Sequence, residues 1–578
     1  MKGLMVGIIL YLVLCMFVGG CNKSDDPVDT YEPLAGDPVE GIRIAWDYSS
    51  MQKLAPQGDR TLGWVGYPRV RRLNDGRLVA VYETQGNGEL VESSDNGESW
   101  SQPVITFQKH TYTNDQGETT DVNIANTELI QLQNGDLVMA CNYRPAKDEI
   151  APFAIAVRRS SDGGQSWSTS EVIYEAGPRF RDGCWEPAFL QLPNGELQVY
   201  FANENPFRTS DEQNISMIHS SDLGLSWSED IKTVCFREGR RDGMPVPLLV
   251  DDEILVAIED NKIGQFKPYI VRTKVSENWE TPVLANSPHR ESALKEPLPD
   301  DVYAGAPYLM KVPSGEVILS YQTTSGRSTD WERSTMEVAI GDKTGRNFSK
   351  LSRPFGVPLD REAKWNSISL WDESTVVAAA TTSFRSPNCE VWIIQGHLIP
   401  ELKAVAGDTQ EDGNINEWGS DFPIFIGHRG ETNLRANVRR DESKLYVCAD
   451  VSDKELISEA DGVYLYLDAD HLSLTAPATG LFRIWCSCKG VIRVEEGDSG
   501  SWKETSTGNI RAVVKSTAGQ GYGIEFEVPF ADLRKDGLSD MRINLGLVES
   551  SANGVIDEEN IAHSTALSSN TWCRLRFE

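Results

Sequence analysis

The 578-residue sequence predicts an all-β protein, a six-bladed β-propeller followed by a β-sandwich domain. Glycine and tryptophan are abundant, at 48 and 15 residues, and turn dipeptides recur throughout, which favours many short strands. A motif of the form S-x-D-x-G-x-x-W occurs three times, and a longer strand-turn-strand unit occurs six times. The chain is also too long for one ordinary core, so a second domain is expected beside the repeats.

The N-terminus has the pattern of an export signal. A lysine, an apolar run over residues 4–18 and two glycines before Cys21 are typical of a secretory signal over residues 1–20. The run is too short to cross a bilayer as a mature helix. The four residues ending at Cys21 resemble a bacterial lipobox, which implies acylation of Cys21 and a linker over residues 21–40. An ordinary signal peptide with an incidental cysteine is the alternative.

The residues after Cys21 bear on localisation. The stretch Asn22–Asp26 is similar to the acidic tag that sends Bacteroidetes lipoproteins to the cell surface. We therefore expect a bacterial outer-membrane lipoprotein, periplasmic or exposed at the cell surface, whose contact with the membrane is the lipid anchor alone.

The short motif marks three turns, Ser93–Trp100, Ser160–Trp167 and Ser220–Trp227. Its aspartate can accept hydrogen bonds from turn amides, its glycine gives a permissive backbone, and its tryptophan packs under the turn. The three copies resemble the Asp-boxes of the sialidase superfamily, which join the outer strands of propeller blades. That resemblance implies a fold, because such boxes lie away from the active site.

The longer unit gives the number of blades. Its first copy, Val70–Val79, places apolar strands on both sides of a turn. Successive turns are roughly 57 to 63 residues apart, the size of a four-stranded blade with its loops. Six copies predict six blades over residues 41–401. Residues 42–48 and 391–399 have strand patterns, and we expect them to share the last sheet and close the ring.

Residues 405–578 have a different pattern, with alternating strands that suggest a β-sandwich. The segments Asp412–Trp418, Leu445–Val451 and Asp461–Asp468 resemble a carbohydrate-binding module of family 9. The resemblance implies a sugar-binding domain. The alternative is a structural sandwich without a sugar site, since no motif identifies binding aromatics.

Charge and cysteine usage limit the partners. The net charge of −31 disfavours nucleic acid and suits a neutral substrate, although a local arginine cluster can override it. Eight cysteines remain after Cys15 and Cys21 are set aside, in a compartment that permits disulfides. Cysteine and histidine show no metal-ligand spacing, so neither a metal nor another cofactor is expected. The sequence does not indicate the oligomeric state.

Polar residues gather where the first strand of each predicted blade begins and the second ends. Those two points share one rim of a propeller, opposite the turns, where a funnel-shaped site would form. The rim residues are Arg69, Glu83, Asn126, Arg144, Glu186, Glu204, Asp242, Glu259, Tyr321 and Asn366.

Glu186 and Glu259 are the candidate catalytic residues. Glycoside hydrolysis needs two carboxyl groups, one to donate a proton and one to attack or to activate water. Glu186 lies in the apolar segment Cys184–Phe189, which should raise its pKa, and Glu259 ends a strand of the neighbouring blade. We expect both to face one cavity. The alternatives are a glutamate paired with an arginine for Glu186 and an exposed strand-end carboxylate for Glu259.

Nearly the whole propeller resembles the exo-arabinanases of glycoside hydrolase family 93. The matching segments are Tyr67–Arg69, Trp185–Pro187, Asn194–Tyr200, Arg241–Met244 and Gly305–Pro307. The resemblance implies that Glu186 and Glu259 form a retaining pair, with the roles of nucleophile and acid/base unassigned, and that the substrate is an α-1,5-linked arabinan.

Further rim residues are expected to bind the oligosaccharide or polysaccharide. Arg69 and Arg241 could bind sugar hydroxyls, Asp242 could orient a hydroxyl or tune Glu259, and Trp185 could stack on a sugar. Blade-to-blade ion pairs and packing within a blade are the alternative roles. Asn126 and Tyr321 complete the set of candidate substrate-binding residues: Arg69, Asn126, Trp185, Arg241, Asp242 and Tyr321.

Two other functions compete. A sialidase binds the substrate carboxylate with three arginines and attacks with a tyrosine, but Ala304–Pro307 contains no arginine and Trp365–Ile368 no tyrosine. Tyr321 on the rim could substitute for that tyrosine. The other alternative is a propeller that binds glycan at the cell surface without catalysis.

Overall fold

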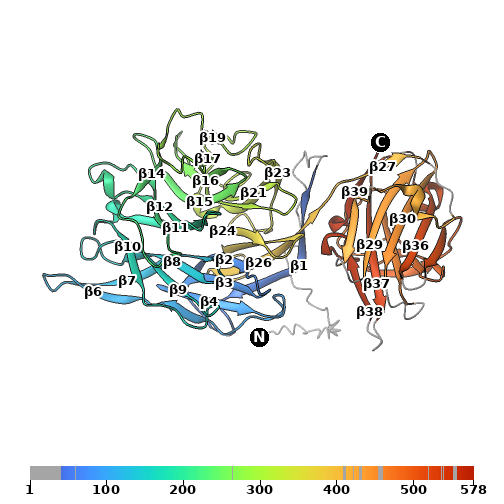
Figure 1. Ribbon diagram of the computed structural model, residues 1–578, viewed down its shortest axis with the longest axis horizontal. Coiled ribbons are helices and arrows are strands. Elements are labelled where there is room, and N and C mark those ends of the chain that lie inside the picture. Colours follow the sequence, from blue (N-terminus) through green and yellow to red (C-terminus); the bar gives the residue numbers. More distant parts are fainter. Residues whose placement is uncertain are drawn as a thin grey trace, which may run out of the picture.

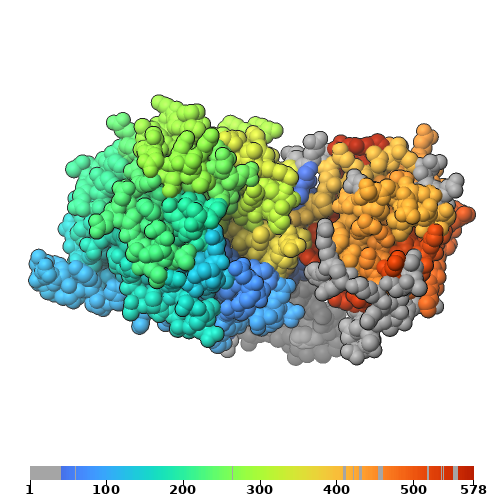
Figure 2. Space-filling view, viewed as in Figure 1, coloured from blue at the N-terminus to red at the C-terminus, as the bar shows by residue number. Residues whose placement is uncertain are grey.

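A computed structural model of the chain describes residues 41–578 except 59, 263, 408–411, 421, 428–431, 454–459, 518–519, 536, 538 and 551–555 (Figure 1). The expected signal peptide, Cys21 and the linker lie outside the described residues. Two β domains lie side by side, the propeller coloured blue to yellow and the C-terminal domain orange to red (Figure 2). Within the described ranges, no helix is long and apolar enough to cross a membrane.

Six separate sheets confirm the six-bladed propeller. From the innermost strand outward, blade one consists of β2 (Val65–Arg72), β3 (Leu78–Thr84), β4 (Asn87–Ser93) and β5 (Val104–Phe107). Blade two consists of β7 (Thr119–Gln131), β8 (Leu137–Pro145), β9 (Ala154–Ser160) and β10 (Glu171–Glu175). Blade three consists of β11 (Cys184–Gln191), β12 (Leu197–Asn203), β13 (Asn214–Ser220) and β14 (Lys232–Phe236). The short strand β6 (His110–Thr113) extends β7 into a projecting hairpin, and β18 (Val283–Leu284) pairs with β14.

Blade four consists of β15 (Asp242–Val250), β16 (Glu253–Asp260), β17 (Lys267–Lys274) and β19 (Arg290–Ser292). Blade five consists of β20 (Ala304–Lys311), β21 (Val317–Thr323), β22 (Thr335–Ile340) and β23 (Ser349–Ser352). Blade six consists of β24 (Ala363–Leu370), β25 (Thr375–Thr382), β26 (Glu390–Ile399) and β1 (Arg43–Ala55). Three short 3-10 helices occupy loops between these strands, η1 (Phe180–Asp182), η2 (Asn205–Phe207) and η3 (Trp331–Arg333).

The first strand of the chain closes the ring, as predicted. β1 pairs antiparallel with β26, from Arg43 opposite Ile399 to Ala55 opposite Val391. The buried indole of Trp46 in this strand donates a hydrogen bond to the Ser352 hydroxyl of blade five at 3.1 Å. The two ends of the propeller segment therefore meet in one sheet, and the outermost edge of β26 is covered.

The three Asp-boxes are turns between the third and fourth strands of blades one to three, as predicted. In the first, Asp95 accepts hydrogen bonds from the Ser93 hydroxyl at 2.7 Å and the Ser99 amide at 3.0 Å. The hydrogen bonds from Ser99 and Ser93 lower the pKa of Asp95 to about 2. The boxes lie at the outer ends of the blades and hold loop conformation.

Every innermost strand has the same β-bulge near its start. In blade one, Gly66 pairs with Glu83 but Arg69 pairs with Val81, so β2 carries one extra residue. Corresponding register shifts occur in β7, β11, β15, β20 and β24. At each bulge one residue has a positive φ between 49° and 55°; these residues are Tyr67, Asn126, Glu186, Met244, Ala306 and Trp365. They form a layer around the central channel, one from each blade.

The C-terminal strands form one curled sheet. Its strands are β27 (Leu402–Ala406), β28 (Ile424–Gly427), β29 (Asn433–Arg440), β30 (Lys444–Ser452), β31 (Gly462–Asp468), β32 (Leu481–Ser487), β33 (Ile492–Asp498), β34 (Ser501–Thr505), β35 (Arg511–Thr517), β36 (Gly521–Pro529), β37 (Met541–Ser550), β38 (Ile556–Asn560) and β39 (Cys573–Phe577). Four short 3-10 helices flank them, η4 (Ile415–Trp418), η5 (Phe530–Leu533), η6 (Ile561–His563) and η7 (Ser569–Thr571).

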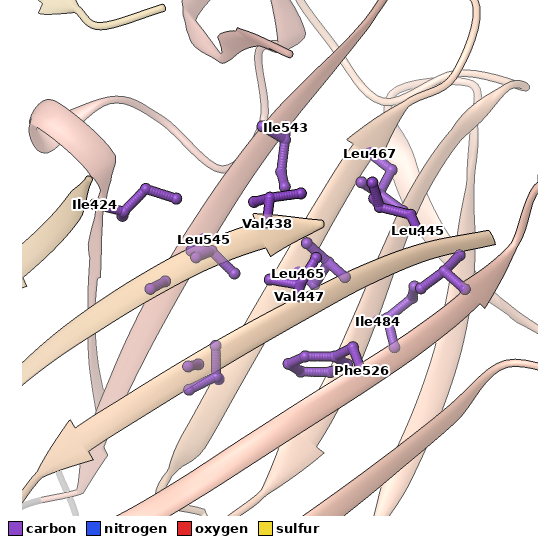
Figure 3. Close-up of a cluster of buried hydrophobic side chains, with 14 of the residues drawn as sticks. Ile424, Val438, Leu445, Val447, Leu465, Leu467, Ile484, Phe526, Ile543 and Leu545 are labelled. Atoms are coloured by element: carbon purple, nitrogen blue, oxygen red, sulfur yellow. The ribbon is translucent and has the colours of Figure 1, made fainter. Parts of the chain in front are cut away.

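This second β domain was predicted, and its two halves enclose one core, with β27 joining them into a single curled sheet. β27 pairs with β39 on one side and with β29 on the other. Apolar side chains of both halves, among them Val447, Phe526, Leu465 and Leu545, then share one core (Figure 3). None of the eight described cysteines is in a disulfide, and seven of them are buried, so apolar packing holds this chain together.

Candidate functional site

Glu186 is the bulge residue of blade three and points into the mouth of the channel. Its backbone has φ 52°, and its side chain is partly open to solvent. None of the described residues forms a hydrogen bond or ion pair with its carboxylate. Burial, followed by the negative charges of Glu259 and Glu204, raises the pKa of Glu186 to about 8, while Arg241 opposes this shift. At neutral pH, Glu186 is therefore a largely protonated carboxyl group that has no hydrogen-bond partner among the described residues.

Glu259 lies in the second strand of the adjacent blade four and is also partly open to solvent. One of its carboxylate oxygens, Oε2, accepts the backbone N–H of Ala306 in blade five at 3.0 Å. Burial raises the pKa of Glu259 to about 7, against this hydrogen bond and the positive charge of Arg241. Since Glu259 raises the pKa of Glu186, the two carboxyl groups interact electrostatically across one mouth, which we call the glutamate mouth.

Four other residues of the bulge layer close the channel beside Glu186. Tyr67, Met244, Ala306 and Trp365 form one apolar cluster, in which the Tyr67 ring stacks on Trp365 at 5.2 Å. The Tyr67 hydroxyl of blade one reaches the Met244 sulfur of blade four at 3.8 Å, across the central channel. A void of only about 10 Å³ lies beside this layer, too little space for a sugar. A substrate therefore has to bind outside this layer, on the side where Glu186 and Glu259 are partly open to solvent.

The other carboxylates of the mouth already have partners. Glu83 accepts the Trp64 indole N–H at 2.9 Å and the backbone N–H of Asn126 at 2.7 Å. Glu204 is buried and bound by the Arg241 guanidinium, which also donates to Gln213 at 2.6 Å. Glu186 and the free oxygen of Glu259 are thus the carboxylate groups of this mouth best placed to meet a ligand.

Three predicted substrate-binding residues lie at the channel, but mainly in structural contacts. Arg69 is buried below the bulge layer, where it donates to Glu128 of blade two at 2.8 Å. Asn126 is the bulge residue of blade two and is buried. Trp185 packs against Phe153 and Phe180, both at 5.0 Å, within the outer part of the mouth.

Asp242 and Tyr321 do not reach the glutamate mouth. Asp242 is fully buried between strands and accepts two hydrogen bonds from Arg290, at 2.6 and 2.8 Å. Tyr321 is fully buried inside blade five, where its hydroxyl donates to Glu337. Its neighbour Gln322 pairs with Gly305, as Glu259 pairs with Gly243, and so occupies the mouth position in blade five. Both corrections follow from the alternation of side chains along a strand.

Sequence reasoning missed Tyr303 and Gln322. A methyl group at Gly305 would lie 2.4 Å from Oε2 of Glu259 and 2.5 Å from the Tyr303 hydroxyl, so these two groups approach each other over a bare backbone. Gln322 donates to that hydroxyl at 2.9 Å and accepts the Trp365 amide at 2.7 Å. No motif marks either residue. The available sequence signal was that Gln322 holds the same strand position in blade five as Glu259 holds in blade four.

Residues 49–247 match the family described as a BNR repeat-like domain. The curated proteins yielded no match. Among solved structures, an α-L-arabinofuranosidase of Fusarium graminearum in complex with arabinobiose is 17% identical, with a TM-score of 0.44, covering 61% of this chain and 97% of that one. An α-L-arabinanase of Penicillium chrysogenum, also with arabinobiose, is 17% identical, with a TM-score of 0.43, over 61% and 97% of the two chains.

A sialidase of Streptococcus pneumoniae is 11% identical, with a TM-score of 0.44, over 60% of this chain and 70% of that one. The propeller is therefore similar to a BNR repeat-like domain over residues 49–247 and, distantly, to arabinanase and sialidase structures.

A second cavity lies at the opposite mouth of the channel. It has a volume of about 1290 Å³ and is lined by the lower ends of the innermost strands, including Arg71, Gln131, Phe189 and Lys311, and by His563 of the C-terminal domain. The floor made by the bulge layer and the Arg69–Glu128 pair separates it from the glutamates. Among the described residues, no group of three His, Cys, Asp or Glu side chains could hold a metal ion.

Proposed function

We propose that the chain is an exo-acting retaining glycoside hydrolase that uses Glu186 and Glu259, with linear α-1,5-arabinan as its substrate. The proposal rests on one observation: two solvent-accessible carboxyl groups from adjacent blades share one mouth, and their pKa values are raised to about 8 and about 7. At neutral pH such a pair holds between one and two protons, so a protonated acid beside an ionised nucleophile is a populated state. The filled channel supports an exo mode of attack, because a glycan cannot thread through it.

In the retaining reaction, one carboxylate attacks the anomeric carbon while the other carboxyl group protonates the departing glycosidic oxygen. A glycosyl ester forms and the shortened glycan leaves. The second group, now ionised, takes a proton from water, whose oxygen displaces the ester and frees the sugar with its original configuration. The reaction requires carboxyl groups about 5 to 5.5 Å apart.

A neutral glycan suits this mouth better than a sialylated one. Arg69 is held below the floor by Glu128 and Arg241 is bound to Glu204, so neither is available as a carboxylate clamp. Burial and the nearby Glu186 raise the pKa of Tyr67 well above its ordinary value, which is opposite to what a tyrosine nucleophile needs.

Product analysis with the full-length protein tests the proposal. We expect arabinobiose from linear arabinan, no sialic acid from sialyllactose, and a loss of turnover of about 10³-fold or more in Glu186→Gln and Glu259→Gln. Azide rescue of the corresponding alanine variants assigns the roles, because the nucleophile variant gives an inverted glycosyl azide and the acid/base variant a retained one. A parent without turnover that binds arabinan would identify a binding propeller, and sialic acid release would identify a sialidase.

We also propose that lipid at Cys21 anchors the protein to the outer membrane and that the C-terminal domain binds the same glycan. Tyr464, Trp485 and Trp502 lie together on one face of the curled sheet, with Arg483 over the rings of Tyr464 at 5.1 Å and Trp502 at 5.2 Å. Trp502→Ala should weaken retention on insoluble arabinan without changing turnover of short oligosaccharides. Equal retention would contradict a sugar site there.

A further inference from the structure

An arc of aromatic rings lines the glutamate mouth on the side of blades five and six. Trp331 meets Trp365 at 6.2 Å and Tyr303 at 6.3 Å between ring centroids, and Trp365 stacks on Tyr67. Trp331 is 42% exposed, a large apolar surface to leave open to water. Rings of this kind bind the apolar C–H faces of sugars.

The exposed Trp331 is held in place by its surroundings. It begins η3, whose preceding residue Asp330 accepts the Glu332 amide. The Lys364 ammonium lies 4.6 Å above the Trp331 ring. Arg327 donates to the carbonyl oxygen of Arg333 at 2.7 Å, which fixes the end of the same loop. An ordered aromatic surface loses little conformational entropy when a ligand binds it.

The arc is connected to the catalytic pair. Gln322 joins the Trp365 amide to the Tyr303 hydroxyl, and that hydroxyl approaches Glu259 over Gly305. A sugar reacting at Glu186 and Glu259 would therefore have its neighbour over Trp331. The positive charge of Lys364 beside Trp331 is neutralised, because Lys364 forms an ion pair with Glu332.

We infer that Trp331, supported by Trp365 and Tyr303, forms a subsite that stacks the second sugar ring of a neutral glycan beside the glutamate pair. This inference rests on the proposed function for its choice of glycan. The subsite recognises chain length rather than the reacting ring, so it sets the preference for oligosaccharides over monosaccharide derivatives.

The test compares Trp331→Ala and Trp331→Phe with the parent on arabinotriose and on an aryl monosaccharide. We expect Trp331→Ala to lower kcat/KM for arabinotriose about 10-fold to 100-fold, mainly through KM, and to leave the aryl substrate within about 2-fold. Trp331→Phe should restore most of the loss. Leu225→Ala, which removes an even more exposed apolar side chain in an Asp-box, 67% exposed against 42% for Trp331, should change nothing.

Calorimetric binding of arabinotriose to the Glu186→Gln protein, with and without Trp331→Ala, separates this inference from the proposed function. Weaker binding on loss of Trp331 supports the subsite even if the parent has no turnover. If turnover requires both glutamates but is unchanged in Trp331→Ala, the subsite is overturned and the hydrolase proposal stands. Equal losses on arabinotriose and the aryl substrate would also overturn it.

Discussion

Glu186 occupies an unfavourable position by two measures. Its backbone is left-handed, a conformation that costs a non-glycine residue about 1 to 2 kcal/mol. Its carboxyl group accepts no hydrogen bond from the described residues, and burial raises its pKa to about 8. Costs of this kind are typical of functional sites, because a neutral or unpaired carboxyl group is a reactive one.

We predict that Glu186→Gln stabilises the fold increasingly as pH rises. Between the unfolded pKa of 4.5 and the folded value of about 8, the native state holds more protons than the unfolded state, so the parent loses stability with rising pH. Glutamine removes this loss. The free energy of unfolding of the variant, minus that of the parent, should grow by on the order of 2 kcal/mol from pH 5 to pH 9 in urea titrations. A difference independent of pH would contradict the raised pKa.

Gly305 gives a second residue-scale prediction. A methyl group there would press on the Glu259 carboxylate and the Tyr303 hydroxyl. We expect Gly305→Ala to reduce kcat by about 10-fold to 100-fold through displacement of Glu259, since small misplacements of reacting groups are costly. The matched control is Gly356→Ala, where an added methyl group meets nothing within 4 Å. Full activity of Gly305→Ala would show that Glu259 tolerates displacement.

Strand position alone determined how the sequence placed the candidate site residues. Glu186 and Glu259 could be placed on one rim because the repeat fixed which strand ends meet there. Tyr321 was misplaced by one residue, and in a strand a shift of one turns the side chain to the other face. Asp242 is followed by a bulge whose extra residue changes the alternation, which a repeat length cannot show.

At the scale of elements, the bulge in each innermost strand is the device that fills the channel. It turns one side chain per blade inward, and in four blades a proline follows the bulge residue: Pro68, Pro187, Pro245 and Pro307. Proline suits this place because it has no N–H to leave unpaired. The proline that follows the bulge residue in four blades therefore marks the channel layer in the sequence. The prediction from strands and turns did not take it into account.

Side chains of one blade also support the bulge of the next. Glu259, Gln322 and the Thr381 hydroxyl accept the bulge amides of Ala306, Trp365 and Tyr67, respectively. Glu259 therefore combines a contact that holds two blades together with one oxygen left for chemistry. Replacement by glutamine preserves the first role, which makes it the better variant for separating catalysis from folding.

The positive φ of the bulge predicts an unusual response to glycine. Ala306 has φ 49°, where glycine is favoured, whereas Ala304 in the same strand is an ordinary buried strand residue. We expect Ala304→Gly to lower the free energy of unfolding by about 1 to 2 kcal/mol, and Ala306→Gly by less than half as much. Thermal and urea unfolding measure both. Equal losses would mean that the bulge carries no backbone strain.

At the scale of the whole molecule, the propeller is held by apolar packing between blades and by the closing strand. Trp46 combines both roles, since it is 2% exposed and donates to Ser352 of blade five. We predict that Trp46→Ala lowers the free energy of unfolding by about 3 to 5 kcal/mol. The control Val104→Ala, at a side chain 54% exposed, should change it by less than about 0.5 kcal/mol. A small effect at Trp46 would show that the ring tolerates an open seam.

The global architecture was the most predictable part, because repeats count blades directly. The curled C-terminal sheet was less predictable. Sequence alternation indicates strands, but a sandwich of two sheets and one curled sheet differ only in how a short strand, β27, pairs on its two sides. The pairing with β39 joins segments about 170 residues apart and leaves no local pattern.

The seam between β1 and β26 has a consequence for biosynthesis. β1, the first of the described strands to leave the ribosome, must wait for a partner made some 350 residues later. Arg43 of this strand also donates to carbonyl oxygens of Asn570 and Trp572, at 2.9 and 2.6 Å. Until the last segments emerge, β1 has neither its sheet nor its neighbour domain. Assembly of the native molecule is therefore a late event that follows synthesis of nearly the entire polypeptide, and a nascent chain halted early would present an unpaired strand to chaperones.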